Sequence, residues 1–476
     1  MSAAATRRGA WCAPGTLRLL ALLALLGGAI VGCGGGAATA DPSEAFPGGD
    51  ATVFRLFAGQ QFGQPAPNLT EAHNATFFTG NSFFNKVWVT APASTTARDG
   101  LGPTFNARSC SGCHFRDGRG RPPDDGGEMD SMLLRVSLAG DGGQAGVVHV
   151  PGYGDQIEPH GIDGVPGEAT VRVRWVERPG RYGDGTPYSL REPVYALANP
   201  AFGPLGDDVL KSGRVAPAMI GLGLLEAIPE QTLLAWADPD DADGDGISGR
   251  VNRVWDVEAR QTRAGRFGWK AGLPSVRQQV GGAFVGDMGI TSPLFPEQNC
   301  PTPQSLCAAA PSGGEPEIPE DRFAAVVLYA ETLAPPTRPD YADPEVMHGR
   351  DLFADIGCTG CHKARVETGA FPALPEMAHQ KIQPYTDLLL HDMGPGLADD
   401  RPEFLATGSE WRTPPLWGIG RVQTVNDHSF FLHDGRARGF AEAILWHGGE
   451  AQAARDAFAS LPAADRDTVV RFLRSL

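Results

Sequence analysis

Two Cys-x-x-Cys-His pentapeptides, at residues 110–114 and 358–362, could do the most specific chemistry in this sequence. This spacing lets two thiols add to the vinyl groups of one haem, while the adjacent histidine binds the iron. A zinc ribbon or a redox dithiol is the alternative, but a ribbon needs its two pairs about 15–20 residues apart. We therefore predict two covalently bound c-type haems, attached through Cys110, Cys113, Cys358 and Cys361, with His114 and His362 as proximal iron ligands.

The remaining cysteines fit an exported protein. Cys12 lies in the N-terminal segment and Cys33 follows its apolar stretch, which leaves Cys300 and Cys307. In an oxidising compartment these last two are expected to form a disulfide across a short loop. A redox-active pair is the alternative.

The N-terminus has the pattern of an export signal. Basic residues precede an apolar stretch at 19–31 that is too short to span a bilayer. The sequence at 30–33 resembles a bacterial lipobox, with Cys33 as the lipidated residue, although cleavage after 38–40 is an alternative. Residues 1–33 would then be a signal peptide and 34–64 a flexible tether. We expect a lipoprotein on the periplasmic side of a bacterial envelope, anchored in the outer membrane.

The charge limits the partners. A net charge of −16 argues against binding to nucleic acid. It suits a basic partner, so we expect a small electron-transfer protein, either a cytochrome or a cupredoxin.

The pattern of apolar residues predicts helices at 70–89, 321–333, 344–354 and 463–476, and short alternating strands between 132 and 175. Each pentapeptide would then belong to one helical unit. We predict a mainly α fold with two c-type cytochrome-like domains, at 65–337 and 338–476, and a β-containing, loop-rich insertion in the first.

Four further segments, at 100–110, 220–226, 286–292 and 410–417, resemble the bacterial di-haem oxidoreductase family, which is described as peroxidase-like. The resemblance runs from about residue 65 to the end. More distantly, the second half is similar to di-haem cytochrome c peroxidases, through motifs at 391–394, 412–416 and 431–436. The rubber oxygenases are a weaker relative.

The resemblance implies a ligand for the second haem. The peroxidases have a methionine ligand where this chain has His447, in the segment 442–448. We predict that His447 is the second axial ligand, and a bis-histidine iron should have a lower potential than a Met-ligated one. Met393 and His391 are the rivals. His391 and His433 are expected to hydrogen-bond haem propionates or backbone.

The first haem has no such clear ligand, and we expect an open or loosely held sixth position. Glu226 matches the distal glutamate of the peroxidases, and Arg214 could stabilise charge beside it. A helix cap or salt bridge is the alternative role for Glu226. Trp411, Trp417 and Trp446 are expected to pack in the core, although they could connect the haems electronically. The other possible distal groups are water and four side chains: His73, His160, Met219 and Met288.

An aspartate-rich loop at 238–246 is a candidate calcium site. Aspartates at every second position beside a glycine suit a hard cation, so Asp241, Asp243 and Asp245 are the expected ligands. A solvated acidic turn is the alternative, because Asn252 stands where an EF-hand has its glutamate.

Together these features predict a di-haem c-type oxidoreductase that reduces a peroxide or another small oxidant at the first haem, with electrons relayed by the second. A pure electron carrier and a dioxygen-using enzyme related to the rubber oxygenases are the alternatives.

Overall fold

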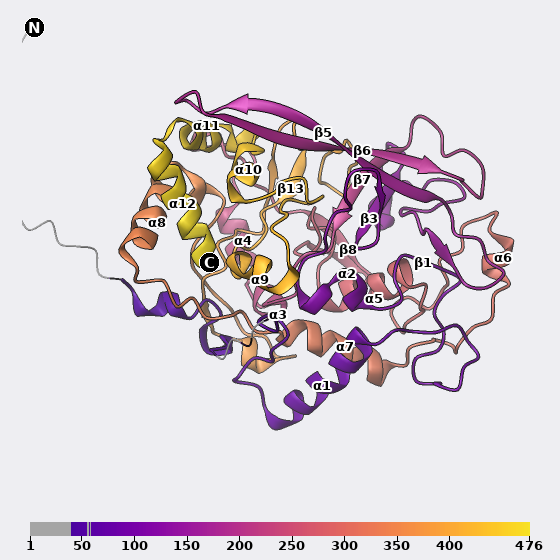
Figure 1. The fold of residues 1–476 in the computed structure, drawn as a ribbon. Coiled ribbons are helices and arrows are strands. Elements are labelled where there is room, and N and C mark those ends of the chain that lie inside the picture. Colours follow the sequence, from indigo (N-terminus) through magenta and orange to yellow (C-terminus); the bar gives the residue numbers. More distant parts are fainter. Residues whose placement is uncertain (1–39, 55–56, 58) are drawn as a thin grey trace, which may run out of the picture. The chain divides into compact units, whose positions relative to one another are not determined.

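The computed structural model describes residues 40–54, 57 and 59–476 (Figure 1). The predicted signal peptide and the lipidation site at Cys33 lie outside these residues. Residues 40–476 form one compact unit, with no separate unit on either side of residue 338. The domain ranges therefore stay predictions. Among the described residues, none of the helices has the length and apolar character needed to cross a bilayer.

The prediction of a mainly α fold is wrong. The chain is 30% helix and 18% strand, and the strands are spread over several small sheets. The main reason is a pair of strands, β5 (Thr170–Arg181) and β6 (Pro187–Ala198), each of 12 residues. The sequence pattern ended the predicted strands at 175, because the outer parts of this hairpin alternate weakly and are exposed on both faces.

A helix pair supports the first pentapeptide. α1 (Glu71–Asn85) packs against α7 (Glu320–Thr332), and the Thr70 side chain caps α1 by accepting from the backbone N–H of His73. Gly80 permits the close approach, since a Cβ there would lie 2.0 Å from the carbonyl oxygen of Ala325. Both helices begin and end close to the predicted residues.

A second helix pair supports the other pentapeptide. α8 (Pro344–Asp355) packs against α12 (Ala463–Ser475), again as predicted, with Phe353 and Phe472 in contact at a centroid distance of 5.3 Å. α5 (Val276–Asp287) has 12 residues, as many as α8. The other α-helices are shorter: α2 (Cys110–Cys113), α3 (Leu222–Glu226), α4 (Glu230–Trp236), α6 (Ser305–Ala308), α9 (Val422–Asn426), α10 (Phe440–Leu445) and α11 (Gln452–Ser460).

All the strand pairs are antiparallel. In the only three-stranded sheet of the described residues, β5 lies between β2 (Gly127–Glu128) and β6. The segment expected as a strand at 147–150 makes only isolated bridges. The two-stranded pairs are β3 (Met132–Ser137) with β7 (Leu210–Val215), β8 (Arg253–Asp256) with β9 (Gln261–Ala264), β12 (Leu390–Asp392) with β13 (Glu410–Arg412), β1 (Thr104–Phe105) with β4 (His160–Gly161), and β10 (Val366–Glu367) with β11 (Lys381–Ile382).

The β5–β6 hairpin connects the two predicted domains (Figure 1). At its tip, the Gly183 N–H donates to the Ala459 carbonyl at 2.9 Å, and Asp184 pairs with Arg466 at 2.8 Å. The N-terminal segment contacts the second half as well, because buried Glu44 pairs with Arg338 at 2.8 Å. These contacts fix the two halves against each other.

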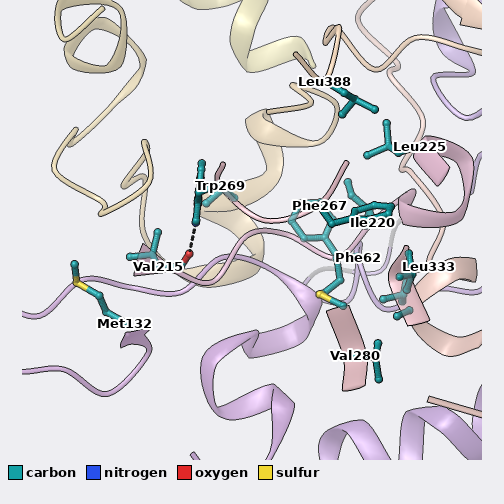
Figure 2. Close-up of a cluster of buried hydrophobic side chains, with 14 of the residues drawn as sticks. Phe62, Met132, Val215, Ile220, Leu225, Phe267, Trp269, Val280, Leu333 and Leu388 are labelled. Carbon is teal, nitrogen blue, oxygen red and sulfur yellow. Dashed lines mark hydrogen bonds between the residues drawn. The ribbon is translucent and has the colours of Figure 1, made fainter. Parts of the chain in front are cut away.

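The hydrophobic core also runs through both halves. Figure 2 shows Leu388, from the second half, in the same buried cluster as Ile220, Leu225 and Phe267 from the first. Burial of large apolar side chains is the main stabilising contribution in such a core. The two halves are therefore expected to unfold together.

A buried pair of acids in the β region predicts a pH-dependent stability. Glu158 and Glu168 are 1% and 2% exposed, and the Glu158 backbone N–H donates to the Glu168 carboxylate at 2.8 Å. Burial raises the pKa of both, that of Glu168 to about 7. Because the folded state keeps a proton that the unfolded state loses above pH 4.5, stability should fall as pH rises from about 4.5 to about 7.

Replacing Glu168 with glutamine should therefore flatten this dependence. The difference in free energy of unfolding between the variant and wild type should be more favourable to the variant at pH 8 than at pH 5, by on the order of 2 kcal/mol. A carboxyl pKa raised to about 7 implies a change of this size. Urea unfolding at the two pH values measures this difference, and Glu71→Gln, at an exposed site on α1, is the matched control. An equal change of both variants with pH would contradict the prediction.

Candidate haem sites

The first pentapeptide forms a single helical turn, α2, that ends at His114. Both sulfurs, of Cys110 and Cys113, are free thiols at half-buried positions. His114 Nδ1 lies 2.8 Å from the carbonyl oxygen of Pro217. Burial lowers the pKa of His114 to about 4, so the ring is neutral and donates its Nδ1–H to this carbonyl. The Nε2 lone pair is thus left for a metal, which is how histidine ligands are usually oriented.

The second pentapeptide has the same arrangement. Cys358 and Cys361 are free thiols, and His362 Nδ1 lies 3.0 Å from the Tyr385 carbonyl oxygen. Burial lowers the pKa of His362 to about 4, and the nearby charge of His447 lowers it further. This contact to Tyr385, 23 residues further along the chain, holds the orientation of the His362 ring.

His447, which directly follows α10 and Trp446, is the second imidazole at this site. Its Nδ1 lies 2.7 Å from the Ala443 carbonyl oxygen, one helical turn earlier, and burial lowers its pKa. In the part of the chain that the structure describes, its Nε2 has no hydrogen-bond partner, and the same holds for His114 and His362. His447 is near enough to His362 to influence its pKa, and ligation of one iron by both histidines stays a prediction.

The rival ligand His391 is engaged at both ring nitrogens. Nε2 lies 3.0 Å from Asp387 and Nδ1 lies 2.7 Å from Glu450. Burial opposes the charged form, but hydrogen bonds to Asp387, Cys361 and Glu450 raise the pKa of His391 to about 12. It is thus an imidazolium held between two carboxylates and has no lone pair for iron. The partners expected for it, a propionate or backbone, are replaced by these two acids.

The other expected propionate partner, His433, stacks on Trp411 with 3.7 Å between ring centroids and an interplanar angle of 11°. Burial lowers the pKa of His433 to about 3, so it is neutral. Of the three tryptophans named from the sequence, Trp411 donates its indole N–H to Leu397, while Trp417 and Trp446 have buried N–H groups with no partner in the described residues.

Two of the distal candidates for the first haem lie near the first pentapeptide: the Met219 N–H donates to the Asp117 carbonyl at 2.9 Å, and Met288 directly follows Asp287. His160 is exposed in β4, and His73 bonds to Glu376 at 2.7 Å. Met219 and Met288 are both buried. Among the described residues, no imidazole is close enough to His114 to affect its pKa, in contrast to His362.

Arg214 and Glu226 do not form one catalytic pair. Arg214 lies 3.3 Å from Asp399, with its guanidinium over the Trp411 ring. The Glu226 carboxylate accepts from the Val276 N–H at 2.8 Å, at the start of α5, which is the capping role given as the alternative. Burial raises the pKa of Glu226. The described residues include no hydrogen bond or ion pair between the two, and their part in catalysis stays a prediction.

A carboxylate that sequence reasoning missed lies near the first pentapeptide. Asp287 is half-buried and accepts a hydrogen bond from Gln156 at 3.0 Å. After burial, its charge is the main factor that raises the pKa of both Cys110 and Cys113, the latter to about 12. Asp287 stands in the 286–292 motif, which was the only signal available from the sequence.

The remaining predicted sites lie apart from the pentapeptides. Cys300 and Cys307 form a disulfide with an S–S distance of 2.03 Å. In the acidic loop, the carboxylates of Asp238, Asp241 and Asp243 come within 4.8 Å of one another, whereas Asp245 accepts from the Ile247 N–H. Calcium binding there stays a prediction, with Asp238 in place of Asp245.

These residues fit haem at both pentapeptides. Each offers two free thiols and a neutral histidine whose Nε2 is available, and each is backed by a helix pair that carries apolar and aromatic side chains. Aromatic rings lie beside both histidines, with Phe84 6.1 Å from His114 and Phe353 6.0 Å from His362. Two such sites in one compact unit define a protein with two haem centres.

The comparison with protein families agrees with this class. The family model described as "Di-haem oxidoreductase, putative peroxidase" matches residues 43–476, and the chain therefore belongs to this family. Its cofactors are accordingly haems, and its general activity is that of an oxidoreductase. Neither a curated protein nor a solved structure matches the chain.

Proposed function

We propose that the protein carries two covalently attached c-type haems and reduces a peroxide at the first, with electrons that enter through the second. Cys110 and Cys113 would hold one haem and Cys358 and Cys361 the other, by thioether bonds. When bound, the haems supply the redox chemistry, which is the two-electron, two-proton reduction of a peroxide to an alcohol and water.

The observation that carries this proposal is the unequal surroundings of the two proximal histidines. His447 lies near enough to His362 to influence its pKa, and neither Nε2 has a hydrogen-bond partner in the described part of the chain, so the two rings could saturate a metal between them. Among the described residues, His114 has no such partner. A saturated iron suits electron transfer, and an open one can bind an oxidant.

The surroundings of the first site can also support peroxide chemistry. The half-buried carboxyl of Asp287 lies close to both cysteines, and desolvation raises its pKa, which favours its holding a proton there. Heterolysis of a peroxide requires a proton at the leaving oxygen, which a group of this kind can deliver. The distal residue itself is left open.

The cellular setting is proposed on separate grounds. A disulfide at Cys300–Cys307 is stable in an oxidising compartment, which supports export to the periplasmic side of the envelope. The net charge of −16 supports a basic electron-transfer protein as the partner. A lipid at Cys33 would hold the protein at the membrane.

Electron paramagnetic resonance of the oxidised and half-reduced protein, with and without hydrogen peroxide, tests this function. We expect one low-spin bis-histidine signal and one high-spin signal that peroxide alters, together with peroxide-dependent oxidation of a reduced small cytochrome. Two low-spin signals in both states and no peroxide consumption would show an electron carrier instead. A stable oxygen adduct of the ferrous protein would indicate a dioxygen-using enzyme.

A further inference from the structure

Two buried arginines, Arg119 and Arg412, have no ion-pair partner among the described residues. Eight arginines of the described residues are buried, and five of them have a carboxylate within ion-pair distance: Arg214, Arg338, Arg401, Arg436 and Arg466. Arg266 lacks one but lies in the field of two carboxylates, those of Glu226 and Glu230. Arg412 lies in the field of one, Asp387, which is already paired with His391 at 3.0 Å. Arg119 and Arg412 are 8% and 7% exposed and bond only to backbone carbonyls in the described part of the chain.

The contacts of Arg119 place it beside the first pentapeptide. It lies five residues after His114, and its backbone N–H donates to the side chain of Asn426 at 3.0 Å. Its Nε and one terminal nitrogen donate to the carbonyls of Phe430 and Leu432, at 3.3 and 2.8 Å. A guanidinium has five N–H donors, so three are left after these bonds. Burial without an acidic neighbour lowers the pKa of Arg119 to about 10.

A short series of hydrogen bonds connects Arg412 to His362 of the second pentapeptide. It ends β13 and donates to the carbonyls of Gly268 and Thr413, at 2.9 and 3.3 Å. The Thr413 carbonyl also accepts from the Thr386 hydroxyl, and Thr386 directly follows Tyr385, whose carbonyl holds His362. Burial lowers the pKa of Arg412 to about 10, although the charge of Asp387 opposes this.

A buried guanidinium without a counter-ion is costly, and such charges persist in proteins when an anion pairs with them. Each haem brings two propionate carboxylates, and a carboxylate matches the planar fork of arginine. We propose that Arg119 and Arg412 bind haem propionates, one arginine for each haem. This inference rests on the proposed haem attachment at the two pentapeptides and not on peroxidase activity.

Both arginines contact one loop. The Arg119 guanidinium lies 5.3 Å from the Trp269 ring centroid, and the backbone N–H of Arg412 donates to the Trp269 carbonyl at 2.9 Å. The Trp269 indole in turn donates to the Val215 carbonyl at 2.9 Å, which fixes the ring (Figure 2). The loop at 268–269 therefore sets both cationic groups, and through them it positions the propionate edges of both haems.

The midpoint potential of each haem, measured by spectroelectrochemistry from pH 5 to 8, tests the proposal. A fixed positive charge favours the reduced iron. Arg119→Gln should therefore decrease the equilibrium constant for reduction of the first haem about tenfold, which lowers its midpoint potential by about 59 mV for one electron. Its released propionate should also titrate in this range and make the potential depend on pH. Arg412→Gln should do the same to the second haem.

Arg466→Gln is the matched control, because Arg466 is equally buried but pairs with Asp184 at the hairpin tip. It should leave both potentials unchanged. Unaltered potentials and pH profiles in both test variants, with two haems still bound, would overturn the proposal. A wild-type protein with fewer than two attached haems would instead contradict the attachment on which it rests.

Arg119→Lys and Arg412→Lys cover the case in which the glutamine variants do not fold. Lysine keeps the charge but cannot form two parallel bonds to a carboxylate. The propionate-bending band in the resonance Raman spectrum reports hydrogen bonding at this group, and it should shift for the first haem in Arg119→Lys and for the second in Arg412→Lys. Unshifted bands in both variants would overturn the proposal.

Discussion

Replacing both Cys110 and Cys113 with alanine is expected to remove one of the two haems and at least 99% of peroxide turnover. The proposed thioether bonds would hold the porphyrin beside His114, whose ring is held in place by the Pro217 carbonyl. Without these bonds, a single histidine ligand would have to retain the haem in a site that is half-buried. The mass of the intact protein under denaturing conditions counts the attached haems directly.

The chain offers a matched control for this experiment. Replacing Cys300 and Cys307 with serine also removes two cysteines, but these form the disulfide and lie outside both pentapeptides. That variant should keep both haems and lose only stability. A Cys110/Cys113 variant that still carries two covalently attached haems would contradict the assignment.

Replacement of His447 is expected to change the second haem without removing it. In His447→Ala the low-spin bis-histidine signal should disappear and a second high-spin signal should take its place, because one axial position becomes open. In His447→Met the iron should stay low-spin. Its equilibrium constant for reduction should rise at least about tenfold, which raises the midpoint potential by about 59 mV.

Paramagnetic resonance and spectroelectrochemistry measure these two outcomes. His379→Ala, at an exposed histidine in the same half of the chain, is the control and should leave both signals as in wild type. An intact low-spin signal in His447→Ala would show that another group binds the second iron. His391 could not easily do so, since both its nitrogens are bonded to carboxylates.

The helix pairs behind the two pentapeptides were predictable from sequence because helical periodicity is a local property. The bounds of α7, α8 and α12 agree with the predicted ranges to within one or two residues. The β5–β6 hairpin was not predicted to its full length, because its strands are stabilised by each other and by contacts to residues 438, 459 and 466. Strands that depend on pairing of this kind show only a weak pattern in the amino-acid sequence of each strand alone.

The sequence by itself determined the chemistry that is carried by neighbouring residues. Two thiols and a histidine within five positions predict a haem attachment site whatever surrounds them, and the prediction for His447 came from the family resemblance of a segment of similar length. Only the tertiary structure decided which charges are neutralised. Glu226 was predicted as a catalytic residue from the family resemblance, and in the structure its carboxylate accepts a hydrogen bond from the Val276 N–H at the start of a helix. Nothing in the sequence distinguishes Arg119 from a surface arginine, but the structure shows that it is buried. The physical reason is that burial and ion pairing depend on residues hundreds of positions away, such as Phe430 for Arg119.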